Sequence, residues 1–127
     1  MSIEIRKKRI LCVDDEMDTC AVIKTILEKE EFEVVSLNTG KDAIKNIELD
    51  GFDLLIFDIM MPDMSGWELY TRVVKIKPNY KIVFLSVLDI TSEKLKELKD
   101  SGVKDYIKKP FDRNDFVTRV KKAINTK

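Results

Sequence analysis

The 127-residue sequence contains no histidine, which excludes a histidine-based catalytic triad, a histidine-ligated metal site and a phosphohistidine of its own. Any chemistry that needs a histidine must therefore receive it from a partner. Cysteine is scarce as well. Cys12 and Cys20 are not spaced like a metal-binding or redox pair such as Cys-x-x-Cys, and we interpret both as small core residues that suit a reducing compartment.

Net charge and long apolar runs are also missing. Lys plus Arg number 23, and Asp plus Glu number 23, so the formal net charge is zero and we expect no direct binding to nucleic acid. No apolar run approaches the ~20 residues of a membrane span, and the start, MSIEIRKKRI, has no apolar core of signal-peptide length. We therefore expect a cytoplasmic protein that does not bind membranes.

The sequence has only four glycines and three prolines, with no linker, repeat or low-complexity tract. Neither GxxxxGK[ST] nor GxGxxG occurs, which disfavours nucleotide binding. The length and the 44% hydrophobic content indicate one domain over residues 1–127, with a core from about residue 9 to 125. The chain ends so soon after its last apolar helical position that we expect no output domain.

Short apolar runs of strand length alternate with segments of helical periodicity. The predicted strands are residues 9–13, 33–37, 54–57, 81–85 and 106–107. Apolar residues recur at helical spacing around residues 20–27, 43–47 and 69–76, and two further helices are predicted near 92–101 and 112–124. Ser65-Gly-Trp-Glu68 is typical of a capping box, Asp112 of an N-cap, and Pro78 of a helix end.

Strands that alternate with helices predict an α/β fold. Parallel neighbours need crossover connections, and helices on both faces of the sheet give a three-layer sandwich. With five strands, the common arrangement is the flavodoxin-like (βα)5 fold, a five-stranded parallel sheet of order 2-1-3-4-5.

In that order, the ends of the first and third strands lie side by side at the ligand-binding edge of the sheet. The stretch RILCVDDE places Asp14, Asp15 and Glu16 there, and LLIF is followed by Asp58. Converging carboxylates repel one another, so a positive charge must compensate them. Carboxylate and carbonyl oxygens suit Mg²⁺, and Mn²⁺ also fits these ligands.

The fourth and fifth strands bring a hydroxyl, Ser86, and an ammonium, Lys109, to the same edge. An aspartate can attack a phosphoryl group, and such transfer depends on positioning and on stabilising the charge of the equatorial oxygens. Asp58 is then the attacking group, with the metal, Lys109 and Ser86 around the oxygens. Each residue alone has an ordinary structural explanation, but four strand ends together favour phosphoryl chemistry.

These residues resemble a response-regulator receiver domain (CheY-like) of two-component signalling, over nearly the whole chain from Ile10 to about Ile124. The resemblance is carried by ILCVDDE, LLIFDIMMPDMSGWEL, VFLSVLD and DYIKKPF. It implies that Asp58 accepts the phosphoryl group, and that Lys109 and Ser86 contact its oxygens. The metal ligands would be Asp14, Asp15, Asp58 and the backbone carbonyl of Met60. Pro110 would follow a cis peptide bond.

The resemblance also implies a switch. Phosphorylation would draw Ser86 toward the new oxygens, and the ring of Tyr106 would rotate into the vacated space and change the surface of the fourth helix, fifth strand and fifth helix. A tyrosine that merely packs at the sheet edge remains the alternative. Threonine is commoner than serine at position 86 in this family. Met60 and Leu88 flank the site and cannot orient an attacking water, so we expect slow hydrolysis.

The function that we expect is a phosphorylation-dependent switch without a turnover substrate, although it promotes its own phosphorylation and dephosphorylation. The phosphoryl group would come from a phosphohistidine of a sensor histidine kinase or phosphotransfer protein, and the downstream protein target is unknown. A monomer and a phosphorylation-dependent dimer both stay open. The alternatives are an Mg²⁺-dependent phosphohydrolase with an Asp nucleophile, which would lack the usual second acid at position 60, and a degenerate receiver that only binds partners.

Overall fold

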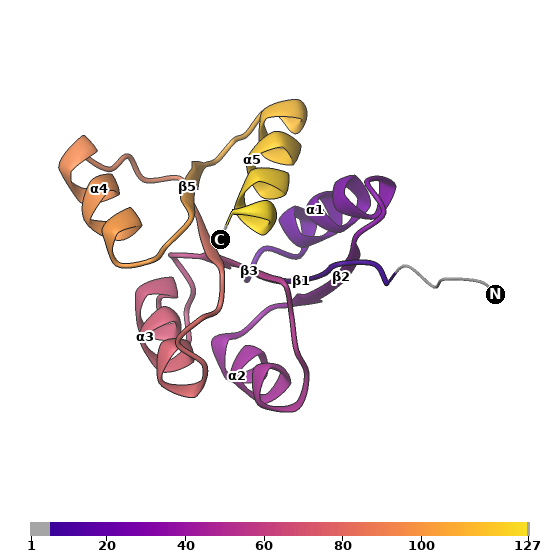
Figure 1. The fold of residues 1–127 in the computed structure, drawn as a ribbon, viewed down its shortest axis with the longest axis horizontal. Helices are drawn as coiled ribbons and strands as arrows, with labels where there is room; N and C mark the ends of the chain where they lie inside the picture. Colours follow the sequence, from indigo (N-terminus) through magenta and orange to yellow (C-terminus); the bar gives the residue numbers. More distant parts are fainter. Residues whose placement is uncertain (1–5, 127) are drawn as a thin grey trace.

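Five strands and five helices alternate along the chain in the computed structural model, which describes residues 6–126 (Figure 1). Residues 1–5 and residue 127 lie outside the described part. The strands are β1 Arg9–Val13, β2 Glu33–Leu37, β3 Leu54–Asp58, β4 Ile82–Ser86 and β5 Asp105–Lys108. The helices are α1 Met17–Lys29, α2 Gly40–Leu49, α3 Gly66–Ile76, α4 Ser92–Asp100 and α5 Arg113–Asn125.

The strands form one parallel sheet of order β2-β1-β3-β4-β5, which confirms the predicted flavodoxin-like fold. The predicted bounds of β1 and β2 match the structure. The other three differ at polar ends: β3 includes Asp58, β4 runs one residue later to Ser86, and β5 extends over two further residues. Pairing with a neighbouring strand holds these ends in the sheet, which hydrophobic periodicity alone cannot show.

The core has two layers, one on each face of the sheet. Helices α1 and α5 cover one face around Ile23 and Phe116, and α2, α3 and α4 cover the other around Ile47 and Leu69 (Figure 1). Strands β3 and β4 are buried along their whole length because both faces are covered. Among the described residues, no helix is long and apolar enough to cross a lipid bilayer.

Four of the five helices begin with a side-chain cap. Thr39, Ser65, Thr91 and Asp112 each accept a hydrogen bond from the backbone N–H three residues on. In the predicted capping box, the Ser65 bond is present, whereas the Glu68 carboxylate pairs with Arg72. Helix α1 begins after Glu16, whose carboxylate contacts Lys109 instead of the helix backbone.

Candidate functional site

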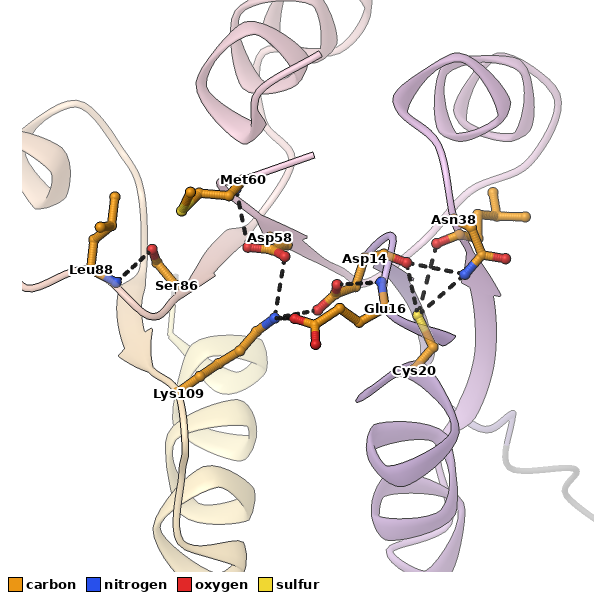
Figure 2. A network of polar contacts seen from close by, with 10 residues as sticks. Asp14, Glu16, Cys20, Asn38, Asp58, Met60, Ser86, Leu88 and Lys109 are labelled. Carbon is orange, nitrogen blue, oxygen red and sulfur yellow. Dashed lines mark hydrogen bonds and ion pairs between the residues drawn. The ribbon is translucent and has the colours of Figure 1, made fainter. Parts of the chain in front are cut away.

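The predicted polar groups meet at the carboxyl edge of the sheet. Val13 of β1 pairs with Phe57 of β3. The next residues of the two segments, Asp14 and Asp58, therefore lie side by side. Among the residues that the structure describes, the buried polar or charged ones are Asp14, Asp58, Ser86 and Lys109. Burial of such groups is costly unless they are paired. All four were predicted from the sequence as site residues, and they line one small region (Figure 2).

Lys109 is the centre of the cluster. Its Nζ lies 2.7 Å from Asp14 Oδ2, 3.2 Å from Asp58 Oδ2 and 3.2 Å from Glu16 Oε1 (Figure 2). Its side chain comes from the end of β5, and the following peptide bond to Pro110 is cis. Two strand ends and the start of α1 are therefore joined through one ammonium group.

The charges of this cluster are unevenly compensated. Burial raises the pKa of Asp14 above its ordinary value, although hydrogen bonds from Lys109 and from the Glu16 amide act in the opposite direction. Burial alone would lower the pKa of Lys109, but the hydrogen bond and charge of Asp14, together with Asp58, outweigh it and raise that pKa. Lys109 thus stays charged, while burial makes the ionised form of Asp14 less favourable than that of an exposed carboxylate.

The main chain of Asp14 is held by residues other than those that contact its carboxylate. Its carbonyl oxygen accepts hydrogen bonds from Asn38 Nδ2 at 3.1 Å and from Cys20 Sγ at 3.3 Å (Figure 2). Both cysteines are buried thiols, in agreement with their interpretation as core residues. The Asp14 carboxylate therefore projects from a rigid backbone.

Asp58 sits at a tight connection between β3 and α3. Its Oδ1 accepts a hydrogen bond of 3.1 Å from the amide of Met60, and the amide of Gly66 donates to Ile59 O at 2.9 Å. A Cβ on Gly66 would come within 2.5 Å of the Asp58 carbonyl oxygen, which is backbone and cannot move aside. The absence of a side chain at Gly66 thus lets α3 begin directly against Asp58.

Ser86 and Tyr106 meet through the backbone of Leu88. Ser86 Oγ accepts a hydrogen bond of 3.0 Å from the Leu88 amide, and the Tyr106 hydroxyl donates to the Leu88 carbonyl at 2.6 Å. The ring of Tyr106 is buried. The expected inward rotation after phosphorylation starts, in this structure, from a ring that is already inside, so the switch role of Tyr106 stays a prediction.

Glu16 belongs to the cluster, whereas the sequence argument assigned the neighbouring Asp15 to the metal. In the described part of the chain, ligand oxygens of Asp14, Glu16 and Asp58 lie within 4.8 Å of one another. Asp15 instead borders a pocket of about 470 Å³ together with Met60 and Ser65. The sequence showed Glu16 as the third acid of the DDE run, but its contact with Lys109 depends on the tertiary fold.

A divalent cation fits this donor set. Three carboxylates against one ammonium leave two negative charges, and all the donors are oxygens. Burial, and to a smaller extent the charge of Asp58, raise the pKa of Asp14; a bound cation would act in the opposite direction. Size alone does not mark the site, since a larger pocket of about 550 Å³ lies at the opposite edge of the sheet, between the Arg6–Arg9 segment and Asp53.

Comparison with curated proteins gives transcriptional regulators. The chain is 32% identical to the transcriptional regulatory protein PcoR of Escherichia coli over 92% of this chain and 51% of that protein. It is also 32% identical to the alkaline phosphatase synthesis transcriptional regulatory protein PhoP of Bacillus subtilis, over 92% of this chain and 48% of that protein. The chain thus spans about half the length of these relatives.

Two solved structures match this chain over nearly their whole length. A CheY-like response regulator receiver domain protein from Methanospirillum hungatei matches with a TM-score of 0.85 and 32% identity, covering 94% of this chain and 95% of that one. The response regulator TrrA of Thermotoga maritima, solved in complex with Mg²⁺ and BeF, matches with a TM-score of 0.78 and 33% identity, covering 91% and 98%. The response regulator receiver domain model matches residues 10–121, and the chain belongs to this family of two-component signalling domains.

Proposed function

We propose that this chain accepts a phosphoryl group on Asp58 from a phosphohistidine of a sensor histidine kinase or phosphotransfer protein, in an Mg²⁺-dependent reaction. The observation that carries the proposal is the buried Lys109 ammonium, which contacts both Asp14 and Asp58. A carboxylate held beside a fixed cation at a strand end is suited to attack phosphorus, because the cation can stabilise the negative charge on the phosphoryl oxygens during the transfer.

The proposed reaction forms a bond between a carboxylate oxygen of Asp58 and phosphorus, while the bond from phosphorus to the donor imidazole nitrogen breaks. Lys109 would pair with a phosphoryl oxygen, and the Ser86 hydroxyl would leave the Leu88 amide to bind another. Each contact stabilises charge on the equatorial oxygens. The Met60 amide holds Asp58 Oδ1 and so fixes the plane of the carboxylate.

The metal would be held by carboxylates of Asp14 and Asp58, with Asp15 or Glu16 as a third acid and the Met60 carbonyl as a further oxygen. Mg²⁺, or Mn²⁺ in its place, would neutralise charge between the carboxylates and the phosphoryl group. Of the two candidate third acids, Glu16 is favoured by its short distance to the other carboxylates.

The histidine must come from a protein partner, since the chain has none. Next to Lys109 lies an open pocket of about 450 Å³, bordered by Val22 and Thr19 of α1 and by Val87, Pro110 and Phe111. These mostly apolar side chains offer contact area for a partner that presents a phosphohistidine to Asp58. Downstream, a change around Tyr106 would alter the surface of α4, β5 and α5 for a protein target.

A phosphorylation assay tests the proposal. We expect incubation with Mg²⁺ and acetyl phosphate to add a single phosphoryl group, detected by mass spectrometry of the intact protein. Asp58→Asn should abolish the adduct because it removes the nucleophile, and a chelator should suppress it in the unchanged protein. Asp63→Asn, which changes an exposed acid five residues away, serves as the matched control and should leave the adduct intact.

The alternatives give different results in the same assay. A degenerate receiver would carry no adduct at all. A phosphohydrolase would release phosphate steadily from small phosphomonoesters, with many turnovers per protein. An adduct that persists in Asp58→Asn would show that another residue is the acceptor and would end the proposal.

A further inference from the structure

The mouth of the phosphoryl-acceptor site has an unusually apolar rim. Met60, Val87 and Leu88 are about half exposed, at 54%, 56% and 49%, although large apolar side chains are normally buried. Met60 follows Asp58 by two residues, and Leu88 follows Ser86 by two. Figure 2 shows the side chains of Met60 and Leu88 beside Asp58 and Ser86. The rim therefore lies where water must approach an aspartyl phosphate.

The rim bears directly on how long a phosphoryl group survives. Hydrolysis requires a water molecule that is oriented toward phosphorus, and a side chain with a hydrogen-bonding group near the attack path can orient it. The side chains of Met60, Val87 and Leu88 offer no strong acceptor. On the proposed function, on which this inference rests, they favour slow hydrolysis.

Met60 differs from its neighbours in one chemical respect, because its thioether can be oxidised. A hydroperoxide transfers one oxygen atom to the sulfur: the O–O bond breaks, an S–O bond forms, and the reduced peroxide leaves as water or alcohol. The product, methionine sulfoxide, is polar and accepts hydrogen bonds, and reductases reverse the change. Oxidation would thus place an acceptor on a rim that has none of comparable strength.

Exposure makes Met60 one of two accessible methionines among the four that the structure describes. Met61 and Met64 are partly buried and pack against the core on the α2 and α3 face, so peroxide reaches them less easily. Met17 is more exposed, at 72%, but it begins α1 after Glu16. Of these four methionines, Met60 is the one whose backbone amide donates a hydrogen bond to the Asp58 carboxylate.

We propose that Met60 is an oxidation site whose conversion to the sulfoxide by hydroperoxides shortens the lifetime of the phosphoryl group on Asp58. The expected change is roughly threefold to tenfold, below the ~100-fold that a positioned general base supplies, since a sulfoxide orients water without removing its proton. The backbone amide and carbonyl of Met60 remain in place after oxidation. The effect should therefore fall on hydrolysis more than on phosphorylation.

The test compares phosphoryl lifetimes before and after hydrogen peroxide treatment. The protein is treated, freed of peroxide, phosphorylated with acetyl phosphate and Mg²⁺, and the loss of the adduct is followed by mass spectrometry. Peptide mapping should find sulfoxide at Met60 and Met17 before Met61 and Met64. Met60→Leu should make the lifetime insensitive to peroxide, whereas Met60→Gln, which carries an amide oxygen, should shorten it without peroxide.

Met17→Leu is the matched control, and its adduct should remain as peroxide-sensitive as that of the unchanged protein. Methionine sulfoxide reductase should restore the long lifetime. The inference is overturned if peroxide shortens the lifetime equally in Met60→Leu, which would point to the thiols, or if it leaves the unchanged protein unaffected. An untreated protein with no adduct on Asp58 would instead show that the proposed function itself has failed, and this inference with it.

Discussion

At the scale of single residues, Lys109 determines whether the acidic site is stable. Its ammonium is the cation that touches two buried carboxylates, Asp14 and Asp58. Removing one partner of a buried ion pair leaves an uncompensated charge, which costs far more than losing a surface pair. The neighbouring Lys108 makes such a surface pair with the exposed Asp89. Two adjacent lysines thus offer a direct comparison.

We expect Lys109→Met, which keeps the aliphatic stem but loses the charge, to lower the free energy of unfolding by about 3–5 kcal/mol without metal. Lys108→Met should cost less than about 1 kcal/mol. Urea denaturation followed by circular dichroism measures both. Adding Mg²⁺ should stabilise Lys109→Met more than the unchanged protein, because the metal then replaces the missing charge. Equal costs for the two substitutions would contradict this account of the cluster.

Residue identities at the site could be predicted from the sequence, but their contacts could not. Asp14, Asp58, Ser86 and Lys109 follow apolar strands, and a parallel sheet brings such ends to one edge. The choice of Glu16 over Asp15 as the acid on Lys109 depends on how the chain turns into α1. No local pattern distinguishes these two acids.

At the scale of elements, the start of α3 is fitted against the end of β3 through Gly66. A Cβ there would meet the Asp58 carbonyl oxygen at 2.5 Å and Ile59 Cα at 2.9 Å, both of them backbone atoms. At Gly51, by contrast, nothing lies within 4 Å of an added Cβ. The connection that follows Asp58 therefore tolerates no side chain at Gly66.

We expect Gly66→Ala to reduce stability by about 1–3 kcal/mol, the usual cost of overpacking, and to slow phosphorylation by acetyl phosphate because Asp58 must shift. Gly51→Ala is the control and should leave both quantities nearly unchanged. Thermal unfolding and the rate of adduct formation measure the two effects. Normal phosphorylation in a destabilised Gly66→Ala would show that the shift is taken up by α3 and not by Asp58.

Helix starts were predictable where a capping side chain marks them, as at Ser65 and Asp112. Strand ends were less so. The predicted fifth strand covered residues 106–107, while β5 extends over Asp105–Lys108, because pairing with β4 recruits flanking polar residues. Alternation of apolar residues reports burial, and these end residues are in the sheet without being apolar.

At the scale of the whole molecule, the helices are held to the sheet very unequally. Helix α1 buries four residues and α5 buries four, whereas α4 buries Leu98 alone among its nine residues. Regions with few buried apolar contacts open locally at low free energy. Helix α4 also lies at the edge of the molecule beside β5 (Figure 1). We therefore expect α4 to be the helix that a change at Ser86 and Tyr106 displaces most easily.

We expect amide hydrogen exchange to be faster in α4 than in α1 and α5, and Mg²⁺ with a beryllium fluoride phosphoryl mimic to change exchange most in α4 and β5. Exchange followed by mass spectrometry, with and without the mimic, measures this. Asp58→Asn with the same additions is the control and should show no change. A response spread evenly over all five helices would argue against α4 as the moving part.

The two hydrogen bonds on Leu88 have a consequence for how information leaves the site. The serine holds this residue by its N–H, and the tyrosine holds it by its C=O. If the serine turns to an incoming oxyanion, the hydrogen bond to the Leu88 amide is lost, and the Leu88 carbonyl keeps its hydrogen bond from the Tyr106 hydroxyl. The response to phosphorylation would then begin as a gain in conformational freedom at one residue, Leu88.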